Sequence, residues 1–206
     1  MEEIALVERE IRESILVKKE LAEKSARQIA QIGGVIVERF KAGKKILVFG
    51  NGGSAADAQH IAAEFVGRYQ AERRALPAIA VTTDTSTLTA LSNDYGFDCV
   101  FARQIEALAN SGDVALAIST SGNSPNVLRA LETAKRLGLL AIGLTGKTGG
   151  EMMDLTDFCI CVPSDSTPRI QEAHILIGHI LSSLVERAFL PEYTAAHHSH
   201  STTTAR

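Results

Sequence analysis

The sequence has little of what would indicate a disulfide-stabilised, membrane-spanning or nucleic-acid-binding protein. Its 206 residues include three cysteines, an odd number, and Cys159 and Cys161 alternate within an apolar run as small core residues do. No run reaches the roughly 18 apolar residues of a membrane span, and the charged start Met-Glu-Glu is unlike a signal peptide. There is no basic cluster, and the net charge is −3, which argues against a surface for nucleic-acid phosphates. We therefore expect a cytoplasmic protein that binds neither a membrane nor a nucleic acid.

What is present fits one globular domain with an appended helix. The hydrophobic share of 45% beside 22% charged residues is ordinary for such a domain, and the length allows a sizeable core. We expect a helical arm over residues 1–43 that serves oligomerisation and an α/β domain over 44–192. The polar end, 193–206, contains three histidines and is predicted to be a disordered tail.

Residues 2–42 are predicted to be helical. Apolar side chains recur at three- and four-residue spacing in two stripes, which are Ile4, Val7, Ile11 and Ile15, then Ile29, Ile32, Ile36 and Phe40. No proline divides them, so one long helix and a helical pair both fit. The stripes either pack on their own domain or form an oligomer interface. We favour the interface, because the apolar surface is longer than one small sheet can cover.

From residue 44 onward, short apolar runs alternate with helical patterns. The predicted strands are 46–49, 78–81, 114–118, 141–144 and 158–162, and the predicted helices are 54–68, 97–110, 124–137 and 168–190. Nearly continuous apolar runs are typical of strands buried on both faces. Their alternation with helices predicts a parallel, doubly wound sheet with right-handed crossovers.

The loop Gly50-Asn51-Gly52-Gly53-Ser54 joins the first strand to an alanine-rich helix. Its glycines let backbone N–H groups approach an anion, and the N-terminus of the following helix favours negative charge. The spacing differs from the dinucleotide-binding pattern G-x-G-x-x-G, and no Gly-Lys-Ser/Thr closes the loop as in a P-loop. The loop therefore predicts a cradle for a phosphate or a sugar phosphate, not for a nucleotide.

A second polar loop follows the predicted strand 114–118 and carries four hydroxyl groups, those of Ser119, Thr120, Ser121 and Ser124. Ser124 is expected to be a helix N-cap with Pro125 at the first helical position. Four hydroxyls are more than a cap requires, and with the helix dipole they predict a phosphate site. Strand ends meet along one edge of a parallel sheet, so we expect loops 50–54, 82–94, 119–124 and 145–150 to lie together. Asn93 and Asp94 enter the candidate site only through this placement, and a simple turn explains them equally well.

Titratable side chains occur at metal-binding or acid–base spacing on two helices. His60 and Glu64 are four residues apart and share a helix face, so they either ligate one metal ion or act as a base and its orienting partner. Such pairs also occur on solvated faces. Gln171 and His179 are about 12 Å apart along the last helix, and reach one metal only by leaning together or by coming from different subunits. His179 fits a core histidine equally well, and His174, on another face, is interpreted as structural.

Four segments, 50–60, 93–96 (Asn-Asp-Tyr-Gly), 119–124 (Ser-Thr-Ser-Gly-Asn-Ser) and 169–172 (Arg-Ile-Gln-Glu), together carry a family resemblance. They resemble the phosphoheptose isomerases, or sedoheptulose 7-phosphate isomerases, of the SIS (sugar isomerase) domain superfamily. The resemblance extends from the N-terminal helix to about Leu190. It implies a SIS-type, flavodoxin-like α/β fold, a doubly wound five-stranded parallel sheet with an N-terminal helical arm, in which 44–192 form the isomerase domain.

The resemblance also implies an activity and a set of site residues. The implied reaction converts sedoheptulose 7-phosphate to D-glycero-D-manno-heptose 7-phosphate through an enediol, the first step toward ADP-heptose and the heptose of the lipopolysaccharide core. The implied assembly is a homotetramer with active sites at subunit interfaces and one zinc ion per subunit. The positions that match zinc ligands are His60, Glu64, Gln171 and His179, with Glu64 and His179 as the catalytic pair. The positions that match substrate-binding residues are Asn51, Gly52, Gly53, Ser54, Glu64, Asn93, Asp94, Ser119, Thr120, Ser121, Ser124 and Gln171. Pro168 stands where some family members have an acidic residue, so no contact is assigned there.

Isomerisation needs a base beside a carbonyl and stabilisation of the developing oxyanion. We favour Glu64 as the base, with His179 moving protons at the sugar oxygens. Lewis-acid polarisation by the metal is a competing role, because a carboxylate and an imidazole bound to zinc carry protons poorly. The rival functions are a non-catalytic paralogue that associates with a replication initiator protein, a sugar-phosphate-sensing regulator, and an isomerase of hexose or pentose phosphates. The presence of both Glu64 and His179 favours catalysis, and no segment is long or basic enough for a DNA-binding domain.

Overall fold

Five parallel strands form the central sheet of the computed structural model, which describes the backbone of residues 1–198 and the side chains of residues 1–190. The strands are β1 (Ile46–Gly50), β2 (Ala78–Ala80), β3 (Val114–Ser119), β4 (Leu140–Thr145) and β5 (Phe158–Cys161). They are ordered β2-β1-β3-β4-β5, and every neighbouring pair is parallel. The predicted doubly wound sheet is confirmed. Every residue of β1 and β3 is buried, which explains their continuous apolar sequences.

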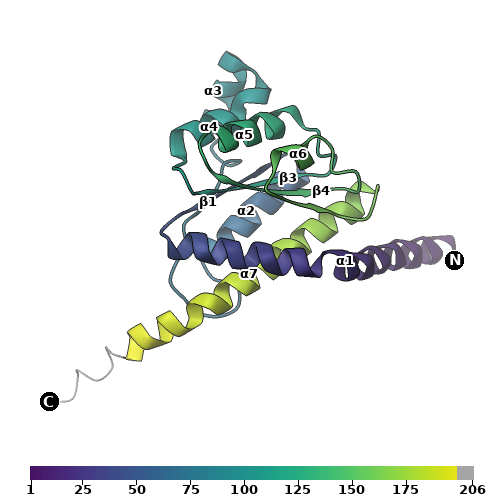
Figure 1. Cartoon of the computed structure of the whole chain (residues 1–206). Coiled ribbons are helices and arrows are strands. Elements are labelled where there is room, and N and C mark those ends of the chain that lie inside the picture. Colours follow the sequence, from purple (N-terminus) through teal and green to yellow (C-terminus); the bar gives the residue numbers. More distant parts are fainter. Residues whose placement is uncertain (199–206) are drawn as a thin grey trace.

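Helices cover both faces of this sheet, as Figure 1 shows. They are α1 (Glu2–Lys41), α2 (Gly53–Val66), α3 (Thr85–Tyr95), the 3-10 helix η1 (Phe97–Cys99), α4 (Val100–Leu108), α5 (Pro125–Arg136), α6 (Met152–Leu155) and α7 (Thr167–His198). On one face α1, α2 and α7 enclose a core with Val48 and Leu116 of the sheet. On the other, α4 and α5 enclose a second core with Leu47 and Ala115. Alternate strand residues thus face opposite helix layers.

The structure differs from the predicted elements in the segment between β2 and β3. Residues 82–94, predicted as a loop, contain α3, whose N-terminus is capped by the Asp84 side chain accepting from the Thr87 N–H at 3.0 Å. No residue of α3 is fully buried, so the short helical pattern that ends at Asn93 and Asp94 lacks the apolar stripe of a core-facing helix. The predicted helix 97–110 is divided into η1 and α4, and the short α6 was not predicted.

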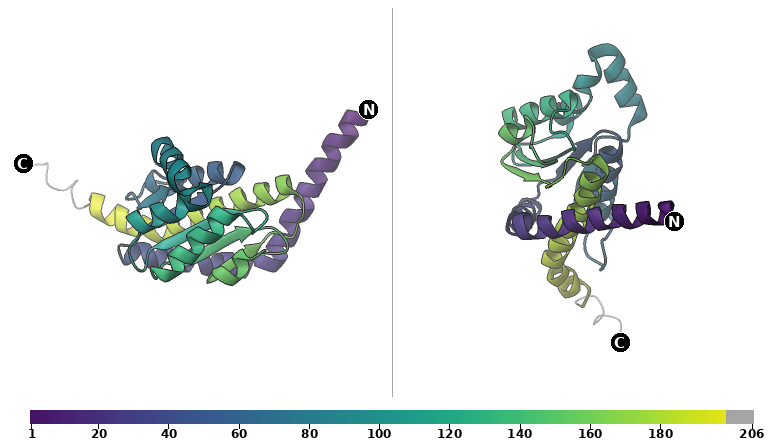
Figure 2. Two further views of the ribbon diagram at one scale, coloured as in Figure 1. Left: turned by 90° about the horizontal axis from the view of Figure 1, so that it is seen from above. Right: turned by 90° about the vertical axis from the view of Figure 1, so that its right-hand side faces the viewer.

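The N-terminal segment is one continuous helix of 40 residues, which resolves the alternative of a helical pair. Its second stripe is buried against α7, with Ile32 and Ile36 fully inaccessible. The first stripe is exposed, and Ile11 and Ile15 are 55% and 59% accessible. This part of α1 extends away from the body of the chain (Figures 1 and 2). The described part of the chain therefore leaves this apolar stripe uncovered.

Helix α7 crosses α1 and runs beside α2, and it carries half of the candidate site. Its residues Thr167–Leu190 have the length and hydropathy of a membrane span, but half of that stretch is buried. Ala173, Ile177 and Leu181 lie within the core, so packing inside the chain accounts for this apolar composition. The helix continues to His198, and the rest of the predicted tail, 199–206, lies outside the described residues.

Candidate active site

The two glycine- and serine-rich loops lie together because their strands are neighbours. β1 and β3 are paired, with Gly50 opposite Ile118, so loops 50–54 and 119–124 leave the same edge of the sheet, as predicted. Asn51 and Asn126 join them through two reciprocal amide hydrogen bonds, both of 2.8 Å. Asn126 is 2% exposed, and sequence reasoning missed this buried partner of the first loop.

The first loop turns directly into α2. Gly52 has a φ of 56°, a conformation that glycine adopts without steric cost. Gly53 lies against the Gln171 side chain, and a Cβ at this position would overlap the Gln171 amide. Ser54, a predicted substrate residue, is 3% exposed and lies beneath the loop against Gly50. The N–H groups of Ser54 and Ala55 close the turn by donating to the carbonyls of Asn51 and Gly52, both at 3.0 Å, and Gln171 borders the loop.

The serine loop has the hydroxyl cluster that the sequence predicts. The hydroxyl groups of Ser119 and Ser124 are hydrogen bonded at 3.0 Å, and Ser121 Oγ accepts the Asn123 N–H at 3.1 Å. Ser124 occupies the N-cap position of α5, but its side chain makes no cap hydrogen bond. Two of the hydroxyls therefore bond to each other at the start of a helix, where an anion is favoured.

A cavity of about 340 Å³ opens beside the serine loop. Its walls include Thr120 and Ser121 of that loop, Lys147 after β4, and Asp165 after β5. Gly122, with a φ of 66°, packs so closely on the backbone of Gly149 that a side chain would not fit. The three loops after β3, β4 and β5 thus form one polar hollow at the carboxyl edge of the sheet.

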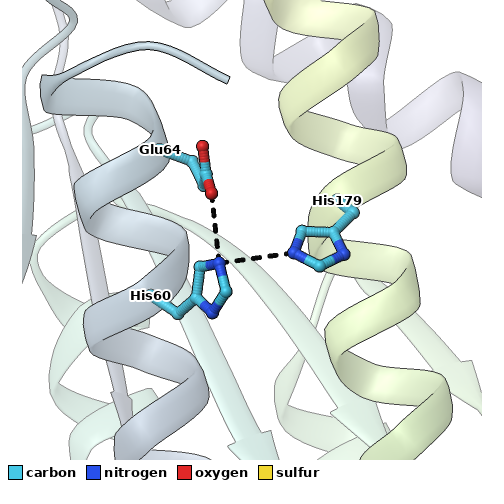
Figure 3. A group of neighbouring side chains, drawn as sticks. All are labelled: His60, Glu64 and His179. Carbon is cyan, nitrogen blue, oxygen red and sulfur yellow. Dashed lines mark hydrogen bonds and ion pairs between the residues drawn. The ribbon is translucent and has the colours of Figure 1, made fainter. Parts of the chain in front are cut away.

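His60, Glu64 and His179 form a compact group between α2 and α7 (Figure 3). His60 Nε2 lies 3.1 Å from Glu64 Oε1 and 3.3 Å from His179 Nε2, and one ligand atom of each residue lies within 4.8 Å of the others. Ligand atoms of a tetrahedral zinc site, bound at about 2.0–2.1 Å, are about 3.3–3.4 Å apart. The two separations from His60 and the nitrogen–oxygen donor set therefore fit a zinc ion, and the Glu64 and His179 ligand atoms lie within 4.8 Å of each other.

Gln171, the fourth predicted zinc position, is on α7 but lies beside the first turn of α2, away from the three clustered side chains. Its amide touches Gly53, which precedes His60 by two turns, or about 10 Å. Within one chain the structure therefore brings together three of the four predicted ligands. Asn93 and Asp94 form the exposed end of α3 and bond to each other at 2.9 Å. The described contacts of α3 are with α4 and η1, so these two residues also lie apart from the group.

Three further residues hold the group in place, and sequence reasoning did not find them. Tyr69 packs on the His179 ring, with centroids 5.7 Å apart. Its loop is fixed by Glu186, which is 4% exposed and accepts the backbone N–H groups of residues 69, 70 and 71 at 2.8–2.9 Å. Arg73 is buried and donates to the backbone carbonyl of Glu64. A buried glutamate two turns beyond His179, within an apolar helix, is the sequence signal that could have indicated this support.

Burial shifts several pKa values near the site, among them those of Asp57 and His174. Burial raises the pKa of Asp57 to about 6, although nearby His60 acts in the opposite direction. His174 is fully buried and hydrogen bonds the carbonyl of Thr145 at 3.2 Å. Burial lowers its pKa to about 4, so the ring is neutral near pH 7 and donates from Nε2. This confirms the structural interpretation of His174.

A family model, curated relatives and solved structures all indicate the same protein family. The SIS domain family model matches residues 11–146. The phosphoheptose isomerase of Nitratiruptor sp. is 63% identical over 155 residues, which cover 75% of this chain and 83% of that protein. That of Aquifex aeolicus is 56% identical over 180 residues, 87% of this chain and 94% of the relative. A solved phosphoheptose isomerase from Francisella tularensis superposes with a TM-score of 0.88 at 39% identity, covering 91% of this chain and all of that one.

Proposed function

The chain belongs to the phosphoheptose isomerases of the SIS-domain superfamily and is an isomerase, and from this premise we propose its substrate and chemistry. It converts sedoheptulose 7-phosphate to D-glycero-D-manno-heptose 7-phosphate, at the start of ADP-heptose synthesis for the lipopolysaccharide core. The observation that carries the proposal is the His60–Glu64–His179 group on α2 and α7, the same two helices that border the first loop. A sugar phosphate needs an anion cradle at one end and acid–base groups at the other, and the serine loop and the His60–Glu64–His179 group support this assignment.

We assign the phosphate group of the substrate to the loops and its reacting carbons to helices α2 and α7. Hydroxyl and N–H donors of the serine loop receive the phosphate, and the N-terminus of α5 adds a favourable dipole. The sugar hydroxyls extend toward α2 and α7. The substrate-binding set is Asn51, Gly52, Gly53, Ser54, Glu64, Asn93, Asp94, Ser119, Thr120, Ser121, Ser124 and Gln171.

Glu64 acts as the base of the isomerisation. Glu64 takes a proton from C1 of the ketose, which gives an enediol. It then returns a proton to C2, which leaves the carbonyl group at C1. Its side chain is 19% exposed, and Arg73 fixes its backbone carbonyl. His179 moves protons at the sugar oxygens, where negative charge develops, and Tyr69 holds its ring in place.

The site is proposed to hold one zinc ion per subunit. His60, Glu64 and His179 supply ligand atoms at suitable separations, and Gln171 is the proposed fourth ligand. When bound, zinc polarises a carbonyl or an oxyanion as a Lewis acid. In our proposal it supports the site while Glu64 carries the proton.

The enzyme is proposed to be a soluble, cytoplasmic homotetramer without a nucleic-acid or membrane partner. The exposed stripe of Ile4, Val7, Ile11 and Ile15 on α1 supports the oligomer, because apolar patches of this length are usually covered by a partner. The separation of Gln171, Asn93 and Asp94 from the histidine group within one chain is consistent with active sites completed between subunits.

Conversion of sedoheptulose 7-phosphate, followed by NMR, tests the proposal. We expect aldoheptose phosphate with the wild type, loss of activity on chelation and recovery with added zinc. Glu64→Gln should bind the sugar phosphate without turnover, whereas Glu38→Gln, an exposed change on α1, should keep full activity. A Glu64→Gln variant with full turnover would refute the assignment of the base. No conversion under any metal condition would refute the isomerase and favour a non-catalytic binding protein.

A further inference from the structure

The cavity beside the serine loop carries its own ion pair. Among the described residues that line it, Lys147 and Asp165 are the charged ones, and the others include Thr120, Ser121 and Asn123. Lys147 Nζ and Asp165 Oδ2 are 3.3 Å apart across the opening. The hydroxyl donors of the serine loop are neutral, so among the described residues of this cavity the positive charge comes from Lys147.

Hydrogen bonds fix the backbone position of Lys147, whereas its exposed side chain is free to move. Lys147 follows β4, and its N–H donates to the Ser164 carbonyl at 3.3 Å. The preceding residue, Gly146, donates to the Thr120 carbonyl at 3.0 Å. Three loops are thus tied together beneath the cavity. The side chains of Lys147 and Asp165 are 63% and 74% exposed, so they can change partners without disturbing the core.

The pair is weak enough to be exchanged. An ion pair this exposed contributes at most about 1 kcal/mol, because water screens it. A phosphate monoester carries a charge of about −1.5 to −2 near pH 7 and offers three acceptor oxygens. It is therefore a better partner for an ammonium group than one carboxylate is.

We propose that Lys147 exchanges Asp165 for the phosphate group of the substrate when a sugar phosphate binds. The inference rests on the proposed function and adds a residue pair to it. Lys147 then contributes attraction, whereas Asp165 competes for the same ammonium group and repels the phosphate. The two side chains of one ion pair should consequently have opposite effects on substrate affinity, which a purely structural pair would not have.

Steady-state kinetics of the full-length, zinc-loaded protein test this exchange. We expect Lys147→Gln to raise KM about 5- to 10-fold and Asp165→Asn to lower KM about 2- to 5-fold, with kcat changed less than twofold in both. The apparent affinity of Lys147→Gln should also depend less on salt concentration. Lys41→Gln, at the exposed end of α1, is the matched control and should behave as the wild type.

A KM unchanged in Lys147→Gln, or raised in Asp165→Asn, would overturn the proposal. Binding of inorganic phosphate to the same variants by calorimetry separates this inference from the proposed function. If the wild type converts no sugar phosphate, the proposed function fails. The order of phosphate affinities, Asp165→Asn above wild type above Lys147→Gln, still decides the exchange, and equal affinities would refute it.

Discussion

Glu186→Gln should destabilise the protein and impair the site, although the described hydrogen bonds of Glu186 go to the 69–71 backbone and not to a proposed zinc ligand. The carboxylate accepts three backbone N–H groups, those of residues 69, 70 and 71, and is 4% exposed. A glutamine keeps one acceptor oxygen, while its NH₂ group faces donors. At least one of these part-buried N–H groups then loses its partner. Hydrogen bonds to a charged group contribute about 1.5–3 kcal/mol each, and a buried unpaired donor costs about 1–3 kcal/mol. We expect a loss of roughly 2–4 kcal/mol in the free energy of unfolding.

Thermal unfolding and kinetics measure the two consequences of this change. A chain of this size loses about 2–4 °C of Tm per kcal/mol, so Tm should fall by roughly 5–15 °C. Because the 69–71 loop positions Tyr69 against His179, kcat/KM should fall about 10- to 100-fold at a temperature where the variant is folded. Glu132→Gln, an exposed change on α5, is the matched control. A Glu186→Gln variant with the Tm and kcat/KM of the wild type would refute this reasoning.

Three further predictions follow from buried or exposed groups. The His174 pKa is about 4 in the folded chain and about 6.5 when unfolded, so its stabilising contribution is complete above pH 6.5 and is lost as the pH falls toward 4. Urea unfolding at pH 7 and 4.5 should show the wild type losing about 2 kcal/mol more than His174→Gln, and equal losses would contradict this. Asn126→Ala removes both amide bonds to Asn51 and should cost roughly 1–3 kcal/mol in urea unfolding while raising KM; a KM and stability like the wild type would show that the loops do not need this link. Ile11→Glu combined with Ile15→Glu should reduce the oligomer to smaller species in light scattering, and an unchanged mass would exclude this stripe from the interface.

The sheet and the loops of the site were predictable because their signals are local. Strands buried on both faces are continuously apolar, as Leu47 and Leu116 illustrate, and the rule for parallel sheets places their following loops on one edge. Residues 82–94 were assigned to a loop despite the short helical pattern that ends at Asn93 and Asp94, because α3 has no buried residue and so no continuous apolar stripe. The Asp84 cap of this helix was the available signal.

The acid–base group was predictable in part, because only one of its contacts lies within a helix. The four-residue spacing of His60 and Glu64 indicates a shared face, whereas the contact of His60 with His179 joins residues 119 positions apart. Spacing left His179 undecided between a core residue and a ligand. The packing of α2 beside α7 places its half-buried ring against His60, and its role as a ligand stays a prediction. The supports from Tyr69, Arg73 and Glu186 depend on tertiary contacts of the same kind, which no local pattern specifies.

Isomerisation in D₂O tests the central claim most directly, namely that Glu64 moves a proton through an enediol. The zinc-loaded wild type should convert sedoheptulose 7-phosphate into an aldose that carries deuterium at C2, detected by NMR and mass spectrometry, because the base exchanges its proton with solvent before returning it. Glu64→Gln should bind the substrate and incorporate none, and Glu38→Gln should match the wild type. Undiminished conversion and deuterium incorporation by Glu64→Gln would contradict the account.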